Sequence, residues 1–356
     1  MRKDKNTDPR LGAVGGQAVM EGVMMKSRTD MAVAVRNDKG NIVVRTKKVT
    51  SVRDKCKPLG WPVIRGVVNF AEMLILSYST LTSSMEMAGL DKIETESKFD
   101  KWVDKHFGKH MLAIVGVIGG VLGVALAVGM FLLLPMWLAK LIDTYLFTLG
   151  WAFSLVEGVF KMILFISYLA LITLMPDVKR LFMYHGAEHK SIFCYEKGLE
   201  LNVENVKKQK RFHPRCGTSF IFVILAISIV IGSFIPHDIG WLRFVLKLAV
   251  IPVIVGIGYE FIRYAGKHEN VCTRFFSAPG LWMQRITTKE PDEKMIEVAI
   301  VSIKSALHDE FPEFEIPYEV KEEEKGQIEE TPGAGPTEQT EQTEQTESEN
   351  VNDDDR

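Results

Sequence analysis

Residues 111–134, MLAIVGVIGGVLGVALAVGMFLLL, decide the class of this protein because they form an apolar run without a single charged side chain. A helix needs about 20 consecutive apolar residues to cross the hydrocarbon core of a bilayer. Three further windows, at 151–175, 218–235 and 241–259, approach or reach that length. The sequence therefore predicts a membrane α-helical protein with about four transmembrane helices and the lipid bilayer as its first partner.

The charges outside these windows predict the orientation in the membrane. The segment between the second and third windows carries nine Lys and Arg residues, whereas the segments on the opposite side carry only Lys140. Because basic loops remain in the cytoplasm, we expect both termini and the middle loop, residues 176–217, to be cytoplasmic. The expected location is the cell membrane (inner or plasma membrane), crossed several times. We expect no cleavable signal peptide, because no apolar stretch follows the basic N-terminus.

Composition separates a basic body from an acidic tail. The whole chain has a formal net charge of −2, but residues 319–356 carry 14 acidic and three basic side chains. This polar segment contains repeated TEQ triplets and is predicted to be disordered. The four cysteines, Cys56, Cys194, Cys216 and Cys272, form no CxxC pair, which excludes a zinc ribbon and a disulfide scaffold. On the cytoplasmic side we expect them to be thiols.

Short elements outside the membrane windows predict a small cytoplasmic α+β region. Residues 31–35 and 41–45 flank a short glycine-containing turn and predict a β-hairpin. Residues 62–88 predict an amphipathic helix, either lying on the bilayer or packed against the bundle. Pro291 and the acidic residues after it predict the start of a last helix that covers the cytoplasmic region. The apolar stripe of this helix consists of Ile296, Ile300, Ile303 and Leu307.

These features divide the chain into five expected segments. They are a hairpin-containing region at 1–60, an amphipathic helix with a basic approach at 61–110, the membrane region at 111–264 with its loop 176–217, a C-terminal helical region at 265–318, and the tail at 319–356. The hairpin, the middle loop and the C-terminal helix are expected to form the cytoplasmic region together.

A polar network is predicted around the N-terminal glycines and the amphipathic helix. Gly15 and Gly16 indicate either a tight turn entering a strand or a close approach of the backbone to another group. We assign to the network the polar residues Gln17, Glu21, Arg65, Asn69, Glu72 and Arg263. Arg65 and Glu72 also fit an ordinary pair on a helix surface.

The segment His185-Gly-Ala-Glu188-His189 is the pattern that indicates chemistry. On a helix, His185 and His189 share one face, in the HxxEH order of the inverted zincins. Two neutral imidazoles suit a divalent metal, zinc above all, and a carboxylate beside the metal-bound water serves as general base. The sequence thus nominates His185 and His189 as metal ligands and Glu188 as the catalytic residue. The same pattern also fits a polar cluster that pairs with basic neighbours or lipid headgroups.

Three residues at the same cytoplasmic level are candidates for the third ligand: His213, Cys216 and Glu260. Two of them also have simpler interpretations. Glu260 can pair with Arg263 one turn further along, and Cys216 can be a small buried apolar residue. The sequence leaves the choice open.

Six motifs follow one another along the chain. They are GGQAVMEGVM (15–24), RGVVN with Glu72 (65–72), YHGAEHK (184–190), HPRCGTS (213–219), YE (259–260) and APGLWMQR (278–285). Together they resemble the YqhQ-type family of bacterial membrane proteins over about residues 10–310. The resemblance implies a protein of unknown function described as a metal-dependent enzyme. That label maps onto His185, Glu188 and His189, and more loosely onto His213, Cys216 and Glu260. The resemblance implies no substrate, and we expect no organic cofactor.

Two functions fit these observations. The first is a metal-dependent hydrolase with a cytoplasm-facing site, acting on a peptide near the membrane surface or on a lipid headgroup. The alternative is a non-catalytic factor for membrane-protein biogenesis or quality control, for example an accessory of the Sec translocon, that docks on other membrane proteins. A transporter ranks third, because the first and third windows carry no charge. We expect no specific nucleic-acid partner.

Overall fold

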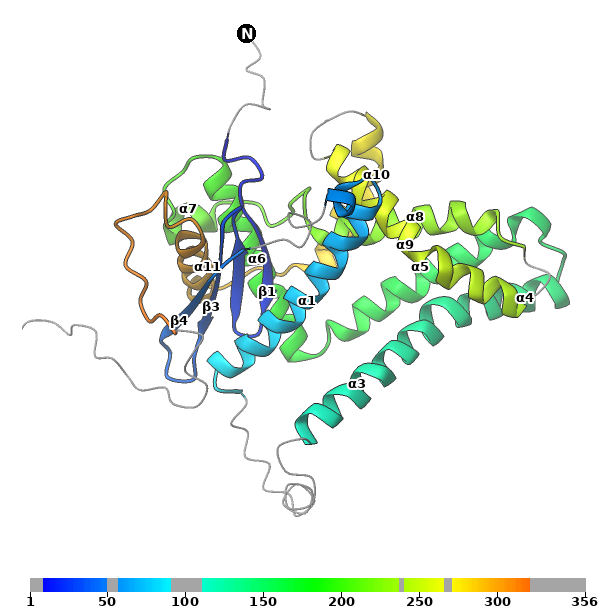
Figure 1. Ribbon diagram of the computed structural model, residues 1–356, viewed down its shortest axis with the longest axis horizontal. Helices are drawn as coiled ribbons and strands as arrows, with labels where there is room; N and C mark the ends of the chain where they lie inside the picture. The colour runs from blue at the N-terminus through cyan, green and yellow to red at the C-terminus, as the bar shows by residue number, and fades with distance from the viewer. Residues whose placement is uncertain (1–8, 50–56, 91–110, 237–239, 266–270, 321–356) are drawn as a thin grey trace, which may run out of the picture. The chain divides into compact units, whose positions relative to one another are not determined.

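The computed structural model describes residues 9–49, 57–90, 111–236, 240–265 and 271–320 (Figure 1). The protein is mostly helical, with one small antiparallel sheet near the N-terminus. Of the predicted segments, the tail from residue 321 and the basic approach at 91–110 lie outside the described residues, as does Cys56. Among the described residues, Cys194 and Cys216 take part in no disulfide.

The sheet has four strands in the order in which they occur in the chain. They are β1 (Gly15–Val19), β2 (Gly22–Lys26), β3 (Asp30–Arg36) and β4 (Ile42–Lys48). The predicted hairpin is β3–β4, closed by a turn in which the Asn41 N–H donates to Asn37 Oδ1 over 2.9 Å and Gly40 adopts φ +86°. β1 and β2 form a second hairpin, which the sequence did not predict. At its far edge, β4 forms a single parallel bridge from Val44 to Glu319.

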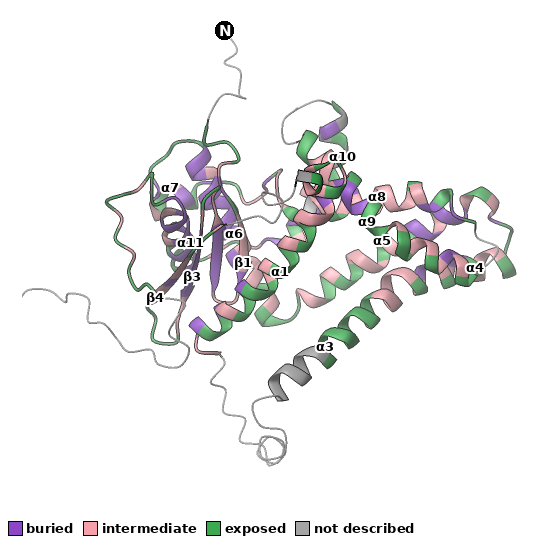
Figure 2. Ribbon diagram, viewed as in Figure 1, coloured by how far each residue is buried: buried purple, intermediate pink, exposed green. Residues whose placement is uncertain are grey.

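Helices cover both faces of the sheet, and its two central strands, β2 and β3, are buried almost throughout (Figure 2). The outer strands β1 and β4 have one fully buried residue each, Val19 and Val44. Val23 and Met25 of β2 face a core shared with α6 (Pro176–Glu196) and α11 (Glu293–Ala306). Met24, pointing the opposite way, lies in a second cluster with Met87 at the end of α1 (Ile64–Met87). The predicted apolar stripe of α11 is buried in the first core, and this helix packs on β2, β3 and α6. The last helix thus covers one face of the sheet.

Three described helical stretches are long and apolar enough to cross a membrane: Ile118–Tyr145, Gly150–Ile172 and Gly240–Ala265. The first consists of the later part of α3 (Met111–Val128), the π-helical turn η5 (Gly129–Leu133) and α4 (Leu134–Tyr145). The second contains η6 (Gly150–Ala152) and α5 (Phe153–Ile172), and the third is α9. The third predicted window, residues 218–235, corresponds to α8 (Gly217–Ser233), which is apolar but shorter than the other three helical stretches.

The first predicted span differs from the observed helix at its end. The sequence places Lys140 and Asp143 in a loop, but the helix continues past Pro135 to Tyr145, and the two residues pair on α4 at 3.1 Å. Proline is tolerated in the first turn of a helix, and the preceding π turn absorbs the change in hydrogen bonding. The helix can therefore continue past residue 134, where the predicted apolar window ends.

The amphipathic helix α1 packs against both α9 and the sheet. It crosses α9 where two glycines meet: a Cβ atom on Gly66 would lie 2.9 Å from the Cα atom of Gly256. Small residues allow such a close approach of two backbones. Of the two predicted settings for this helix, packing on the bundle is the one observed, although Ile75 and Tyr78 remain exposed.

Candidate metal centre

The HGAEH segment lies within α6, so its predicted helical conformation is confirmed. The helix starts with Pro176 and Asp177, residue types that favour a first turn, and Gly198 at φ +66° follows its end. Gly186 sits against the chain after α10 (Val271–Thr287): a Cβ atom there would lie 2.0 Å from the carbonyl oxygen of Lys289. The glycine in the motif is therefore required by packing.

The rings of His185 and His189 lie side by side, with centroids 4.4 Å apart. His185 Nδ1 lies 2.8 Å from the carbonyl oxygen of Thr287, and His189 Nδ1 contacts the carbonyl oxygen of Arg211. Because a carbonyl oxygen only accepts, both Nδ1 atoms carry the proton, and both Nε2 atoms keep a free lone pair. Burial lowers the pKa of His189, which also favours the neutral ring. Both imidazoles are held in the form that binds metals.

Cys216 supplies the third group of the centre. Its Sγ atom lies 3.3 Å from His185 Nε2, and the ligand atoms of His185, His189 and Cys216 all lie within 4.8 Å of one another. Cys216 is also the residue that precedes the first turn of α8. Its sulfur is therefore presented from the start of a rigid helix, beside the two imidazoles.

His213 lies next to this group but is turned away from it. Its ring packs 5.7 Å from that of His189, centroid to centroid. Its Nε2 atom lies 3.4 Å from Glu196 Oε2, and its Nδ1 atom accepts from the backbone N–H of Arg215. Burial alone would raise the pKa of Glu196, but the hydrogen bond from His213 and the charge of Arg215 lower it. Both nitrogens of His213 are therefore engaged, and this residue supports the turn that presents Cys216.

Glu260 is engaged elsewhere. On α9 it accepts two hydrogen bonds from the guanidinium group of Arg65 on α1, one of them 2.6 Å long from Nε to Oε1. The sequence did not predict this pairing of Arg65 with Glu260, and the charge of Arg263 also acts on Glu260. Arg263 is exposed one turn further along α9. The structure thus brings Cys216, and neither His213 nor Glu260, to the two histidines.

Glu188 is deeply buried, with 4 % of its surface exposed. Its Cγ atom lies where Gly16 of β1 leaves room: a Cβ atom on Gly16 would lie 2.8 Å from it. The sequence left two interpretations of the paired glycines open. The backbone of Gly16 makes the predicted close approach, to the side chain of Glu188, and Gly15 is the first residue of the strand β1. Among the described residues, Glu188 Oε2 has no hydrogen-bond partner. Burial raises the pKa of Glu188 to about 7.

The polar residues of the N-terminal sheet connect it to its neighbouring helices. Gln17 accepts a hydrogen bond from Ser77 of α1 over 2.6 Å. Glu21, a non-glycine residue at φ 53°, pairs with Arg180 of α6 and accepts from the Tyr184 hydroxyl. Asn69 and Glu72 lie half-buried on α1. Gln17 and Glu21 thus act as links between elements.

Sequence reasoning missed the groups that hold the centre in place. Gln284 of α10 is fully buried and exchanges two hydrogen bonds with the backbone of His213, at 2.7 and 2.8 Å. It lies within the motif at 278–285, which was the available signal. The carbonyl groups of Thr287 and Arg211 left no signal, because every residue has a carbonyl.

A family model described as "Protein of unknown function (DUF1385)" matches residues 61–309. The chain belongs to this family. A relative from Bacillus subtilis (strain 168), named "Uncharacterized protein YqhQ", is 36% identical over 301 residues, which cover 83% of this chain and 92% of the relative. The resemblance to the YqhQ-type family is thereby confirmed. No solved structure matches. In this DUF1385 protein the matched region contains His185, His189 and Cys216, whereas the four strands precede it.

Proposed function

We propose that this DUF1385 protein binds one divalent metal, zinc, through His185, His189 and Cys216, and acts as a metal-dependent hydrolase. One observation carries the proposal: the three ligand atoms converge, while backbone carbonyls hold both histidines with Nε2 free. Oriented imidazoles of this kind are typical of metal sites.

The donor set fits zinc. Imidazole nitrogen and thiolate sulfur are the ligands that zinc prefers, and three protein ligands leave a fourth position for water or substrate. Sites with four protein ligands are structural, whereas sites with three are catalytic. When bound there, zinc would lower the pKa of a coordinated water and polarise a carbonyl or phosphoryl oxygen.

The chain's own residues supply the proton chemistry. Glu188 precedes His189, and its carboxylate interacts electrostatically with His185. With a pKa of about 7, this carboxyl group can both accept and release a proton near neutral pH. Thr287 and Arg211 keep the protons of the two histidines on Nδ1, so that proton exchange falls to Glu188.

The setting of this centre follows from the charges of the chain. We place both termini and α6 on the cytoplasmic side of the bacterial cell membrane, because the basic residues gather between α5 and α8. Four crossings, with α8 as the short one, return the chain to the side where it began. A 17-residue helix is about 25 Å long, slightly less than the hydrocarbon core. The substrate would then be a peptide or lipid headgroup at the cytoplasmic surface.

The test is elemental analysis of the detergent-purified chain beside a His185→Ala/His189→Ala variant. We expect about one zinc per wild-type chain, lost in the double variant and kept in the control His308→Ala, which changes an exposed histidine. Glu188→Gln should keep the metal and lose hydrolytic activity. Metal content that is unaffected by the double variant would refute the centre.

The alternative, a non-catalytic factor for membrane-protein biogenesis, is supported by a different observation. The bonds Gln17–Ser77, Glu21–Arg180 and Arg65–Glu260 join the sheet, α1, α6 and α9 into one polar frame. A docking protein needs such a frame and no reactive centre. Under this alternative Glu188→Gln is harmless to cells that depend on the protein, and crosslinking captures membrane proteins or translocon subunits.

A further inference from the structure

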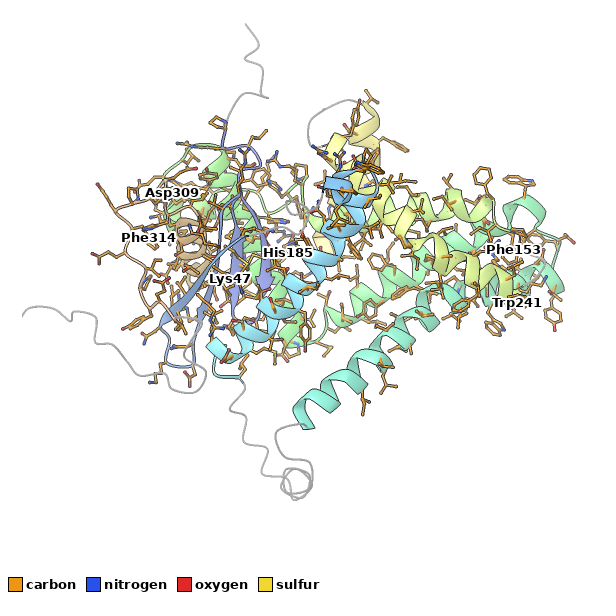
Figure 3. All side chains as sticks on the ribbon, in the orientation of Figure 1. Lys47, Phe153, His185, Trp241, Asp309 and Phe314 are labelled. Carbon is orange, nitrogen blue, oxygen red and sulfur yellow. The ribbon has the colours of Figure 1, made fainter. Side chains whose placement is uncertain are left out.

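A second polar cluster lies inside the helix bundle. Glu157 of α5 pairs with Arg243 of α9 at 3.0 Å and also with Lys247. The side chain of Arg243 is 1 % exposed, and it also donates to Ser154 Oγ over 2.8 Å. Phe153, whose ring lies 5.0 Å from the Arg243 guanidinium, marks this end of the bundle together with Trp241 (Figure 3).

The cluster holds more positive than negative charge. Lys161, one turn after Glu157, lines the same cavity, and its charge acts on Glu157 and Arg243. Within the part of the chain that the structure describes, no hydrogen bond or ion pair reaches the Lys161 ammonium group. Three cations therefore share one carboxylate. An uncompensated charge in such a setting is costly and is retained where it has a use.

The cluster also has an unsatisfied donor that no change of protonation can remove. Arg243 Nε is buried and finds no hydrogen-bond partner among the described residues. A lysine could lose its proton to relieve the charge, but a guanidinium group stays protonated. An acceptor from outside the chain would satisfy both Arg243 and Lys161.

The space between these side chains limits what can enter. About 10 Å³ is open to the centre of a water-sized sphere, which is room for roughly one oxygen atom. The walls include the hydroxyl-bearing residues Ser154 and Ser228 as well as the three cations. One atom of a larger anion fits, with the rest of the anion outside.

The cluster lies near the level of lipid headgroups. Trp151 and Trp241, at 87% and 71% exposed, are side chains typical of the membrane–water interface. At 1.5 Å per residue, Arg243 lies about 3 Å and Glu157 about 9 Å further along their helices. An anion at the headgroup level is thus within reach of the cavity.

We propose that Lys161, Arg243 and Lys247 form a binding site for a phosphate-type anion, one oxygen of which enters the cavity between them. The phosphate of an anionic lipid and free inorganic phosphate present the same oxygen, so either source satisfies the site. This site is separate from the metal centre, and its occupancy does not depend on the proposed hydrolase activity.

The test is the thermal unfolding midpoint of the full chain in detergent, with phosphatidylglycerol or phosphatidylcholine added, or with inorganic phosphate against chloride at equal ionic strength. The unfolding midpoint of the wild type should rise when phosphatidylglycerol is added and should not change when phosphatidylcholine is added. A response to the lipid alone identifies a headgroup, and a response to inorganic phosphate as well identifies the free anion. No response to either refutes the proposal.

Lys161→Met separates an anion site from a structural charge. Because no hydrogen bond or ion pair among the described residues holds the Lys161 ammonium group, its removal should raise the midpoint without anion and weaken phosphatidylglycerol binding by about tenfold. Two control variants should show the same rise in midpoint with phosphatidylglycerol as the wild type. They are Lys161→Arg, which keeps the charge, and Lys140→Met, which removes an exposed lysine paired with Asp143. A Lys161→Met variant that keeps the full lipid response, or that loses stability with and without anion alike, overturns the proposal. Zinc content should be equal in all four proteins.

Discussion

The candidate metal centre and the basic cluster of the bundle leave opposite kinds of polar atom without a partner. At the metal centre, backbone carbonyls take up the N–H groups of His185 and His189, and ring lone pairs remain. In the basic cluster, Glu157 and Ser154 take up some of the donors, and N–H groups of Arg243 and Lys161 remain. Surplus acceptors suit a cation and surplus donors suit an anion. The comparison teaches that the unpaired atoms of a buried cluster, rather than its residue types, indicate its ligand.

The largest effect is expected from Glu157→Gln, which removes the carboxylate shared by Arg243 and Lys247. Removing one partner of a buried ion pair costs about 4 kcal/mol of unfolding free energy. The variant should unfold at a much lower temperature than the wild type in detergent without phosphate or anionic lipid. Lys161→Met, its matched control, should shift the midpoint in the opposite direction. Equal midpoints for Glu157→Gln and the wild type would mean that the cluster carries no net charge.

A smaller effect is expected from the pH dependence of Glu188 in metal-free protein. Its pKa of about 7 lies above the usual 4.5, so the folded chain keeps this proton over a range in which the unfolded chain has lost it. The resulting stability is fully present below about pH 4.5 and is lost as the pH rises through 7. Relative to Glu188→Gln, chelator-treated wild type should lose on the order of 3 kcal/mol across this window.

Denaturant unfolding from about pH 5 to about pH 8 measures this difference. The matched control is Glu200→Gln, at an exposed glutamate beyond the end of α6. Its unfolding free energy should differ from that of the wild type by the same amount at every pH. If the difference in unfolding free energy between Glu188→Gln and the wild type is also independent of pH, Glu188 is ionised in the folded chain. This result would contradict the proposed role of Glu188 in proton transfer.

The smallest of the three effects is expected from Gly186→Ala. The added methyl group would meet the carbonyl oxygen of Lys289 at 2.0 Å, so the backbone on one side must move. Such overpacking costs about 2 kcal/mol. Because Thr287 lies two residues before Lys289, the shift should also loosen His185 and lower zinc content. Gly15→Ala, where nothing lies within 4 Å, should leave both the melting temperature and the zinc content unchanged.

Local patterns predicted much of the fold. The apolar windows, the β3–β4 hairpin and the stripe of α11 depend on neighbouring residues, and all three were readable. The β1–β2 hairpin was not, because its turn places Glu21 at a positive φ without the usual glycine or asparagine. The continuation of the first span through Pro135 to Tyr145 was also missed, because the apolar window ends at residue 134 and the π turn before Pro135 has no sequence signature.

The site was predictable only where spacing along one helix determines it. His185 and His189 were found by their separation of four residues. The choice of Cys216 over His213 and Glu260 depends on distant partners that spacing does not encode. Gln284 orients the turn before Cys216 from 71 residues away, and Arg65 binds Glu260 from 195 residues away.

The single parallel bridge between Val44 and Glu319 affects how this protein meets other chains. The Val44 N–H donates to the carbonyl oxygen of Tyr318 over 2.7 Å, and its own carbonyl accepts from the Val320 N–H over 2.9 Å. An open edge strand offers such groups to any extended peptide and invites aggregation. Here the chain's own C-terminal segment caps the middle of β4. A shortened protein ending before Tyr318 would uncover this edge and gain a tendency to self-associate through its sheet.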